Sequence, residues 1–190
     1  MALDRKLPAI LSGKEQADTK ERLTLASMCQ QHKKRYAAAA RFYSEAFANE
    51  PKLTEEPSTS LRYNAACAAA LAGCGQGIDA DKLDSKERTR LRRQALDWLR
   101  ADLAIWGQLL EKGPAKARPV VAQKMQHWLK DSDFAGVRNA DELNRLSESE
   151  RRDWLQLWRD VEALRQRAAS AASPGVKEPN STKESPTPKP

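Results

Sequence analysis

Apolar residues along this chain recur three and four positions apart, with polar residues between them. This spacing predicts a succession of amphipathic helices. β-Branched residues are sparse, and Ala, Leu, Arg, Lys, Gln and Glu dominate the composition, which favours an all-α fold. The most regular stripe lies in the middle of the chain and runs through Leu96, Leu99, Leu103, Trp106 and Leu110.

Start and stop signals divide this pattern into seven predicted helices. Asp18 with Glu21, Asp84 with Glu87 and the Ser147–Glu150 segment have the spacing of helix N-termini, and Ser58–Ser60 can cap another helix. Pro51 and Gly113-Pro114 end helices. The predicted helices run from Asp18 to about His32, over 36–49, over 61–71, from Asp84 to Lys112, through Val121–Leu129, from Asn139, and from Ser147 to about Ala169.

The first two helices form the best-defined unit. They are joined by Lys33–Arg35 alone, so they must lie antiparallel. Small residues would let the two helices touch, and a large ring would fill the gap to the next unit. The second helix resembles that of a tetratricopeptide repeat at Tyr36, Ala39, Tyr43, Ala46 and Pro51.

A second, degenerate unit resembles the opening of another repeat at Arg62–Ala66, and Ala95 and Leu99 would belong to its second helix. It departs from the pattern in two ways. An insertion separates its two helices, and Asp102 stands where a small residue is expected. The repeat geometry is therefore expected to distort after the first hairpin.

Longer segments resemble one particular group, the repeat-bearing C-terminal region of certain bacterial serine/threonine protein kinases. The resemblance covers about Leu7 to Arg167 and is carried by 30–43, 62–73, 93–103, 127–138 and 157–158. It implies a partner-binding region attached, or once attached, to a signalling kinase. It does not imply kinase activity, because the chain lacks the nucleotide loop and catalytic motifs, and Arg151-Arg152-Asp153 is a look-alike inside a helix.

These observations predict four parts. Residues 1–17 are an N-terminal extension, 18–112 are tetratricopeptide-like hairpins, and 113–169 are appended helices packing on the same core. From residue 170 to residue 190 the chain is rich in Pro, Ser and Lys, which predicts a disordered tail. The start of the chain lacks the apolar stretch of a signal peptide and no window could span a membrane, so we expect a cytoplasmic protein.

The predicted function is the binding of a protein or peptide without catalysis. Stacked hairpins leave a concave face lined by first helices. Asn64 would either bind a peptide backbone or brace the turn between units. The predicted partner-binding residues are Thr24, Met28 and Gln31 from the first unit and Tyr63, Asn64 and Cys67 from the second.

The net charge of +7 raises an alternative, the weak binding of nucleic acid or of an acidic partner by helix 86–100. The residues that would carry this binding are Lys86, Arg88, Arg90, Arg92 and Arg93. The neighbouring Asp84, Glu87 and Asp97 dilute this patch, so a solvated helix face is the favoured interpretation and nucleic acid is not the expected partner.

Specific chemistry is not indicated elsewhere. Three cysteines without a C-x-x-C pair and two histidines without ligand spacing predict neither a metal nor a cofactor. Cys29 with His32 is the nearest thiol–imidazole pair, and it lacks an orienting group. The glycines of 73–77 are expected to end a helix rather than bind phosphate. Trp154 and Trp158 could stack a ligand, but core packing is favoured.

Overall fold

The computed structural model describes residues 2–55 and 59–170, and these residues form helices and connecting turns without a β-strand. Three short 3₁₀ segments accompany the α-helices: η1 (Pro51–Thr54), η3 (Ala80–Lys82) and η4 (Ser132–Val137). The α-helices are α1 (Ala2–Leu11), α2 (Thr19–Gln31), α3 (Tyr36–Asn49), α4 (Leu61–Gly73), α5 (Ser85–Lys112), α6 (Ala117–Lys130), α7 (Ala140–Leu143) and α8 (Glu148–Ser170).

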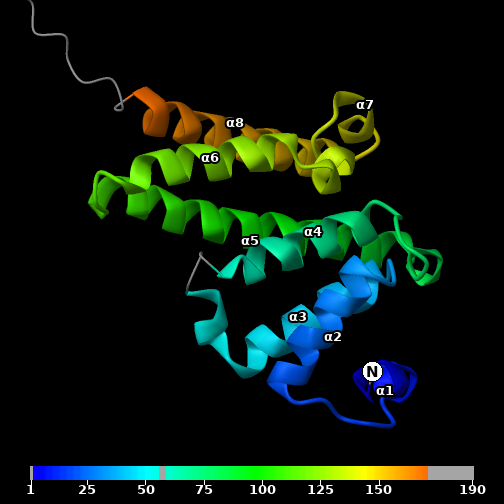
Figure 1. Ribbon diagram of the computed structural model, residues 1–190. Helices are drawn as coiled ribbons and strands as arrows, with labels where there is room; N and C mark the ends of the chain where they lie inside the picture. Colours follow the sequence, from blue (N-terminus) through cyan, green and yellow to red (C-terminus); the bar gives the residue numbers. More distant parts are fainter. Residues whose placement is uncertain (1, 56–58, 171–190) are drawn as a thin grey trace, which may run out of the picture.

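The long helices pack as three antiparallel pairs that lie one above another (Figure 1). The pairs are α2 with α3, α4 with α5, and α6 with α8. Helix α3 also contacts α4, and α5 contacts both α6 and α8, so the middle pair joins the outer two. The fold is therefore all-α, as the sequence predicts, and is built from adjacent helix pairs.

Most of the helix starts follow the predicted signals. The Asp18 carboxylate accepts from the Glu21 amide at 2.8 Å, and the Glu21 side chain accepts from the Asp18 amide at 3.2 Å. Asp84 accepts from the amide of Glu87 at 2.7 Å. At the start of α8 the predicted box is half formed. The Ser147 hydroxyl accepts from the Glu150 amide, but the Glu150 carboxylate binds a side chain of α5 instead.

The predicted apolar stripes form the core. In α5, Leu96, Leu99, Trp106 and Leu110 are buried and Leu103 is half-buried. In α8 the rings of Trp154 and Trp158 stack with centroids 6.1 Å apart, and both side chains are buried. The core interpretation of this tryptophan pair is therefore confirmed.

The first hairpin packs through small residues, as expected. Ala39 and Ala46 of α3 have no exposed surface, and Tyr43 is 2 % exposed. Helix α2 contributes Leu25, Ala26 and Cys29, which are also fully buried. Alanine-sized side chains on both helices permit the close approach that a short connection requires.

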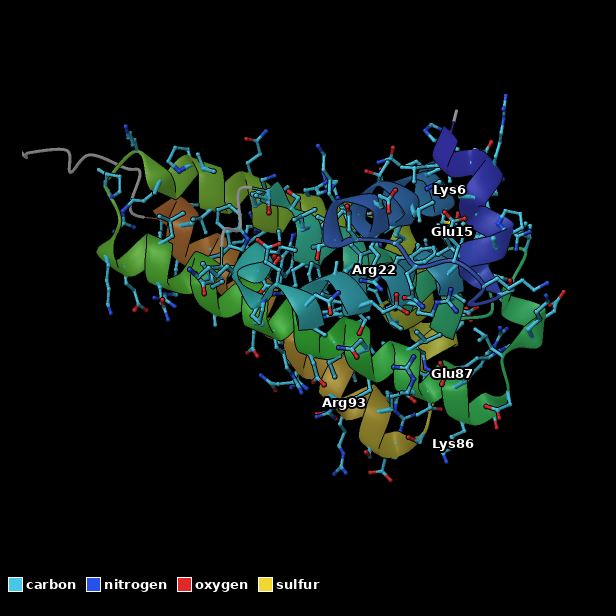
Figure 2. The ribbon with its side chains drawn as sticks, turned by 90° about the horizontal axis from the view of Figure 1, so that it is seen from below. Lys6, Glu15, Arg22, Lys86, Glu87 and Arg93 are labelled. Carbon is cyan, nitrogen blue, oxygen red and sulfur yellow. The ribbon has the colours of Figure 1, made fainter. Side chains whose placement is uncertain are left out.

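Helix α1 is an addition that the sequence did not predict within the N-terminal extension 1–17. Leu7 and Ile10 are buried in the core, and ion pairs join Lys6 to Glu15 at 2.9 Å and Lys33 to Asp4 at 2.7 Å. Figure 2 shows Lys6 and Glu15 side by side at this end of the molecule. A helix this short, with Pro8 inside it, gains its stability from packing rather than from local propensity, so a local pattern misses it.

The glycine-rich segment ends α4 and forms a turn, as the sequence predicts. Gly75 and Gly77 have φ angles of +79° and +95°, and a Cβ on Gly77 would lie 2.7 Å from the Lys34 carbonyl oxygen. Just beyond, the Asp79 carboxylate accepts from the amides of Ala37 and Ala38 at 3.3 and 3.0 Å. This connection therefore caps the start of α3 from a distant part of the chain.

Two sequence predictions lie wholly or partly outside the described residues. The predicted tail begins at 170, and Ser170 is the last residue of α8, whereas 171–190 are not described. Ser58 is not described either. Ser60 makes no capping bond through its side chain; the Leu61 amide instead lies 3.5 Å from the hydroxyl of Thr59. None of the described helices combines the length and the apolar character needed to cross a membrane.

Candidate functional site

The structure places the six predicted partner-binding residues in two separate regions. Thr24 and Met28 line an open groove between α1 and α2, and Gln31 is exposed at the end of α2. Tyr63 and Asn64 line a small pocket between α4, α5 and α6. Cys67 lies one turn further along α4 and is 3 % exposed. The six residues therefore do not line one continuous groove.

The first region, which we call the α1–α2 groove, has a volume of about 690 Å³. Its lining is mainly apolar, and its apolar side chains are half-buried rather than sealed in the core. The Lys33–Asp4 ion pair joins α1 to the segment that follows α2. Its lining residues are Leu3, Asp4, Leu23, Thr24, Ser27, Met28 and His32.

The second region, which we call the polar pocket, has a volume of about 140 Å³. It combines aromatic walls with carboxylate, amide, ammonium and imidazole groups. The Asn64 side chain forms no hydrogen bond with any other residue of the described chain, so its amide is available in this pocket. The lining residues are Ser60, Tyr63, Asn64, Asp102, Trp106, Lys124, His127 and Trp128.

Asp102 is a buried charge in the wall of this pocket. It is 3 % exposed and accepts from Nη1 of Arg62 at 2.9 Å, while Arg62 also donates to the carbonyl of Thr54. Burial raises the pKa of Asp102 to about 6, and the Arg62 guanidinium opposes this rise only in part. The departure from the repeat pattern at this position is thus compensated by an arginine on the paired helix.

Beside the pocket lies a group of interacting polar side chains, which we call the polar junction: Tyr63, Cys67, His127, Asp131 and Asp133. The Tyr63 hydroxyl donates to Oδ2 of Asp131 at 2.6 Å, and Nε2 of His127 lies 3.5 Å from the same oxygen. Oδ1 of Asp131 accepts from the amide of Asp133 at 3.0 Å. Cys67, Asp131 and Asp133 each offer a ligand atom, and these atoms lie within 4.8 Å of one another.

Burial and neighbouring carboxylates control protonation in the polar junction. Desolvation, followed by the charges of Asp131 and Asp133, raises the pKa of the Cys67 thiol well above its usual value. Burial and then Asp131 raise the pKa of Asp133, and burial raises the pKa of Tyr63. Cys67 is therefore a neutral thiol near pH 7 when nothing is bound, and a bound cation would favour its thiolate.

The thiol–imidazole pair noted in the sequence has no activated nucleophile. Cys29 is fully buried, and burial raises the pKa of its thiol to about 11. His32 is exposed at the end of α2 and lines the α1–α2 groove. A thiol with so high a pKa remains protonated near pH 7.

The basic side chains of helix 86–100 are largely engaged within the fold. Arg90 pairs with Glu87 at 2.7 Å, Arg92 with Glu150 at 2.5 Å, and Arg93 with Asp97 and Asp153. Arg88 donates to the carbonyl of Ala80. Figure 2 shows Lys86, Glu87 and Arg93 along α5. These contacts favour a structural role for the arginines, in joining α5 to its surroundings, over phosphate binding.

Sequence reasoning missed the polar junction, which brings residues of α4 together with others at least 60 positions later. The usable signal was the run His127-x₃-Asp131-x-Asp133, which puts three potential ligands at the end of one helix. No protein-family model, curated protein or solved structure matches this chain.

Proposed function

We propose that this protein is a non-catalytic partner-binding module of the tetratricopeptide-like type. The three stacked antiparallel helix pairs support this proposal, as does the burial of Ala39, Tyr43 and Ala46 at the positions where the repeat pattern requires packing. Stacked helix pairs commonly bind proteins along faces that the stacking leaves open.

The observation that carries the proposal is the α1–α2 groove. A volume of about 690 Å³ and a mainly apolar lining suit the apolar side chains of a peptide or of an amphipathic helix. Thr24 and Met28, both proposed from the sequence as binding residues, lie in this lining. The groove therefore forms the principal binding surface, and the polar pocket beside Asn64 is a second, smaller one.

The chemistry of the groove restricts its occupant. Leu3, Leu23 and Met28 offer flexible apolar contact, whereas Thr24, Ser27 and His32 offer hydrogen bonds near the rim. The partner is expected to present apolar side chains on one face and polar groups at the edges of that face. Apolar burial then supplies most of the affinity, and the rim fixes orientation.

A link to serine/threonine kinase signalling in the bacterial cytoplasm is part of the proposal. It rests on the resemblance at 30–43, 62–73 and 93–103. Most of the first segment lies in α3, and the second and third segments lie entirely in α4 and α5. These are core-forming helices, so the resemblance concerns the scaffold, and the partner is expected to be a kinase or a protein that a kinase regulates.

The proposal is tested by affinity purification from cells with the wild-type chain and matched variants. Met28→Glu places a charge in the α1–α2 groove, and Lys20→Glu makes a charge change at an exposed site on the same helix, outside the groove lining. We expect one defined partner, recovered with wild type and Lys20→Glu and reduced at least about tenfold with Met28→Glu, because a charge that loses water on binding is costly.

Three further results of the same experiment are informative. Asn64→Ala should reduce the recovery of the partner if the free amide binds it. The recovery should stay unchanged if the groove alone binds the partner. Equal recovery with wild type and Met28→Glu, in variants with unchanged circular dichroism, would show that the groove is not the binding surface. A partner without any serine/threonine kinase association would refute the signalling link but not the groove.

A further inference from the structure

The polar junction contains the donor atoms of a metal site, drawn from two regions of the chain. Cys67 comes from α4, His127 from the last turn of α6, Asp131 from the junction of α6 and η4, and Asp133 from the start of η4. The thiol sulfur and one oxygen from each carboxylate lie within 4.8 Å of one another. A modest contraction would bring these three atoms into the first coordination shell of a single ion.

The charge balance of the polar junction supports this interpretation. Two carboxylates lie close together beside a thiol that is 3 % exposed, and within the described residues no lysine or arginine forms an ion pair with either carboxylate. Arg138 donates to the carbonyl oxygens of Trp128 and Asp131 instead of to a carboxylate. Elsewhere in the structure, the buried carboxylate of Asp102 does have an arginine. The negative charge of the polar junction thus has no fixed protein cation.

The kinds of donor atom indicate which ions would bind. Sulfur and imidazole nitrogen are ligands of zinc and similar transition metals, whereas calcium and magnesium prefer an all-oxygen set. We propose that Cys67, His127, Asp131 and Asp133 bind one divalent transition-metal ion of the zinc type. The proposal departs from the sequence-based expectation of no metal, because sequence spacing does not show that Cys67 lies beside the other three.

The surrounding contacts suit such a site. The His127 side chain is 59 % exposed, so its ring can turn toward the ion, and its Nε2 is already 3.5 Å from Oδ2 of Asp131. The Tyr63 hydroxyl bonds that same carboxylate from outside the site and orients it, the usual role of an outer hydrogen bond. Binding would release the thiol proton of Cys67 to solvent and leave a thiolate ligand.

The expected consequence is structural. The ion would join α4 to the end of α6 and the start of η4, where the middle helix pair meets the third pair. Four protein ligands would complete a tetrahedral shell, which is typical of structural rather than catalytic zinc. Metal binding should therefore raise the thermal stability of the whole chain.

The proposal is tested on the full chain after treatment with a chelator and removal of the chelator. Titration with Co²⁺ should give one bound ion per chain, with the absorption bands of tetrahedral cobalt and a sulfur-to-cobalt charge-transfer band in the near ultraviolet. Zn²⁺ should displace the Co²⁺ and raise the melting temperature. Cys67→Ser should abolish the charge-transfer band, and the matched control Cys74→Ser should retain it, because Cys74 lies outside the polar junction.

Asp133→Asn provides a second, independent test of metal binding that leaves the buried Cys67 thiol in place. It should weaken Zn²⁺ binding by more than about tenfold, since the loss of even an outer-shell partner costs about 10- to 100-fold. Absence of Co²⁺ binding by wild type, a cobalt spectrum without thiolate character, or unchanged zinc affinity in Asp133→Asn would each overturn the proposal. If Cys67→Ser does not fold, the wild-type spectrum and Asp133→Asn decide the matter.

Discussion

The first hairpin and the polar junction are stabilised in opposite ways. In the hairpin, α2 and α3 meet through fully buried Leu25, Ala39 and Ala46, and the ion pair of Arg22 with Glu45 adds one partly buried polar contact. In the polar junction and the adjoining pocket, hydroxyl, thiol and carboxylate groups lie inside the packing of α4, α5 and α6. Contacts close in sequence thus stabilise the hairpin through shape, whereas distant contacts stabilise the second region through polar pairing.

The difference shows where specific chemistry can arise in a helical stack. Apolar packing of small residues tolerates little change in volume but offers few groups for recognition. Buried polar groups contribute less to stability, because each must recover the interactions that it loses with water. Their presence between α4 and α6 therefore suggests a role beyond holding the helices together.

The largest effect is expected in the hairpin. Phe42 is 1 % exposed, so Phe42→Ala should leave a cavity and lower the free energy of unfolding by about 3–5 kcal/mol. The exposed control Lys20→Ala should change it by less than about 0.5 kcal/mol. Urea denaturation followed by circular dichroism measures both. A loss below about 1 kcal/mol for Phe42→Ala would contradict the packing described for α3.

Substitution of the Arg62–Asp102 pair by apolar residues would make the polar pocket resemble the apolar packing of the first hairpin. Asp102→Leu alone should cost about 3 kcal/mol, because it leaves the Arg62 guanidinium buried without its partner. Adding Arg62→Met should recover most of that loss, since an apolar pair removes both charges from the interior. The same denaturation assay compares the two variants. An equal loss in the double variant would show that the ion pair itself is strongly stabilising.

The pH dependence of stability gives a finer test of the same carboxyl. Its pKa is raised from 3.8 to about 6 in the folded chain, so the folded state binds more protons than the unfolded state between these values. Wild type should therefore gain about 2 kcal/mol relative to Asp102→Asn as the pH falls from 7 to 4. Denaturation at several pH values measures this difference. A loss of stability of wild type relative to Asp102→Asn over the same pH range would mean that Arg62 lowers the pKa of Asp102 by more than burial raises it.

Paired tyrosine substitutions compare the two regions by the removal of a single atom. Tyr63→Phe takes a donor from Asp131 and should cost about 1 kcal/mol. Tyr43→Phe in the hairpin should cost less than about 0.5 kcal/mol, because among the described residues the Tyr43 hydroxyl forms no hydrogen bond. Thermal melts of the two variants measure the contrast. Equal losses would remove the distinction between the regions.

The contrast between contacts close in sequence and contacts across the chain also explains which features could be predicted from the sequence. The bounds of α3 and the starts of α2 and α5 follow from local signals: Asp18, Asp84 and the alanine-rich stripe from Tyr36. Burial of Trp154 was also predictable, because its neighbours at helical spacing are apolar. These features depend on residues a few positions apart, which a periodic pattern records.

The rest depends on contacts across the chain. Helix α1 is stabilised by α2, and Asp79 caps α3 from more than 40 positions away. The sequence predicted Thr24 and Tyr63 on one face, but Thr24 lines the α1–α2 groove and Tyr63 lines the polar pocket. The two are separated because α4 packs mainly against α3 and not against α2. Only the arrangement of the pairs brings Cys67 to Asp131 and Asp133.

Site-specific crosslinking shows whether a partner occupies the α1–α2 groove. A photoreactive amino acid replaces Met28 in one variant and Lys124, at the polar pocket, in another, and each chain is irradiated in living cells. If a partner binds in the groove, we expect a strong crosslink to one defined protein from position 28 and a weaker crosslink, or none, from position 124. Crosslinking from position 124 alone, or from neither position, would contradict binding in the groove.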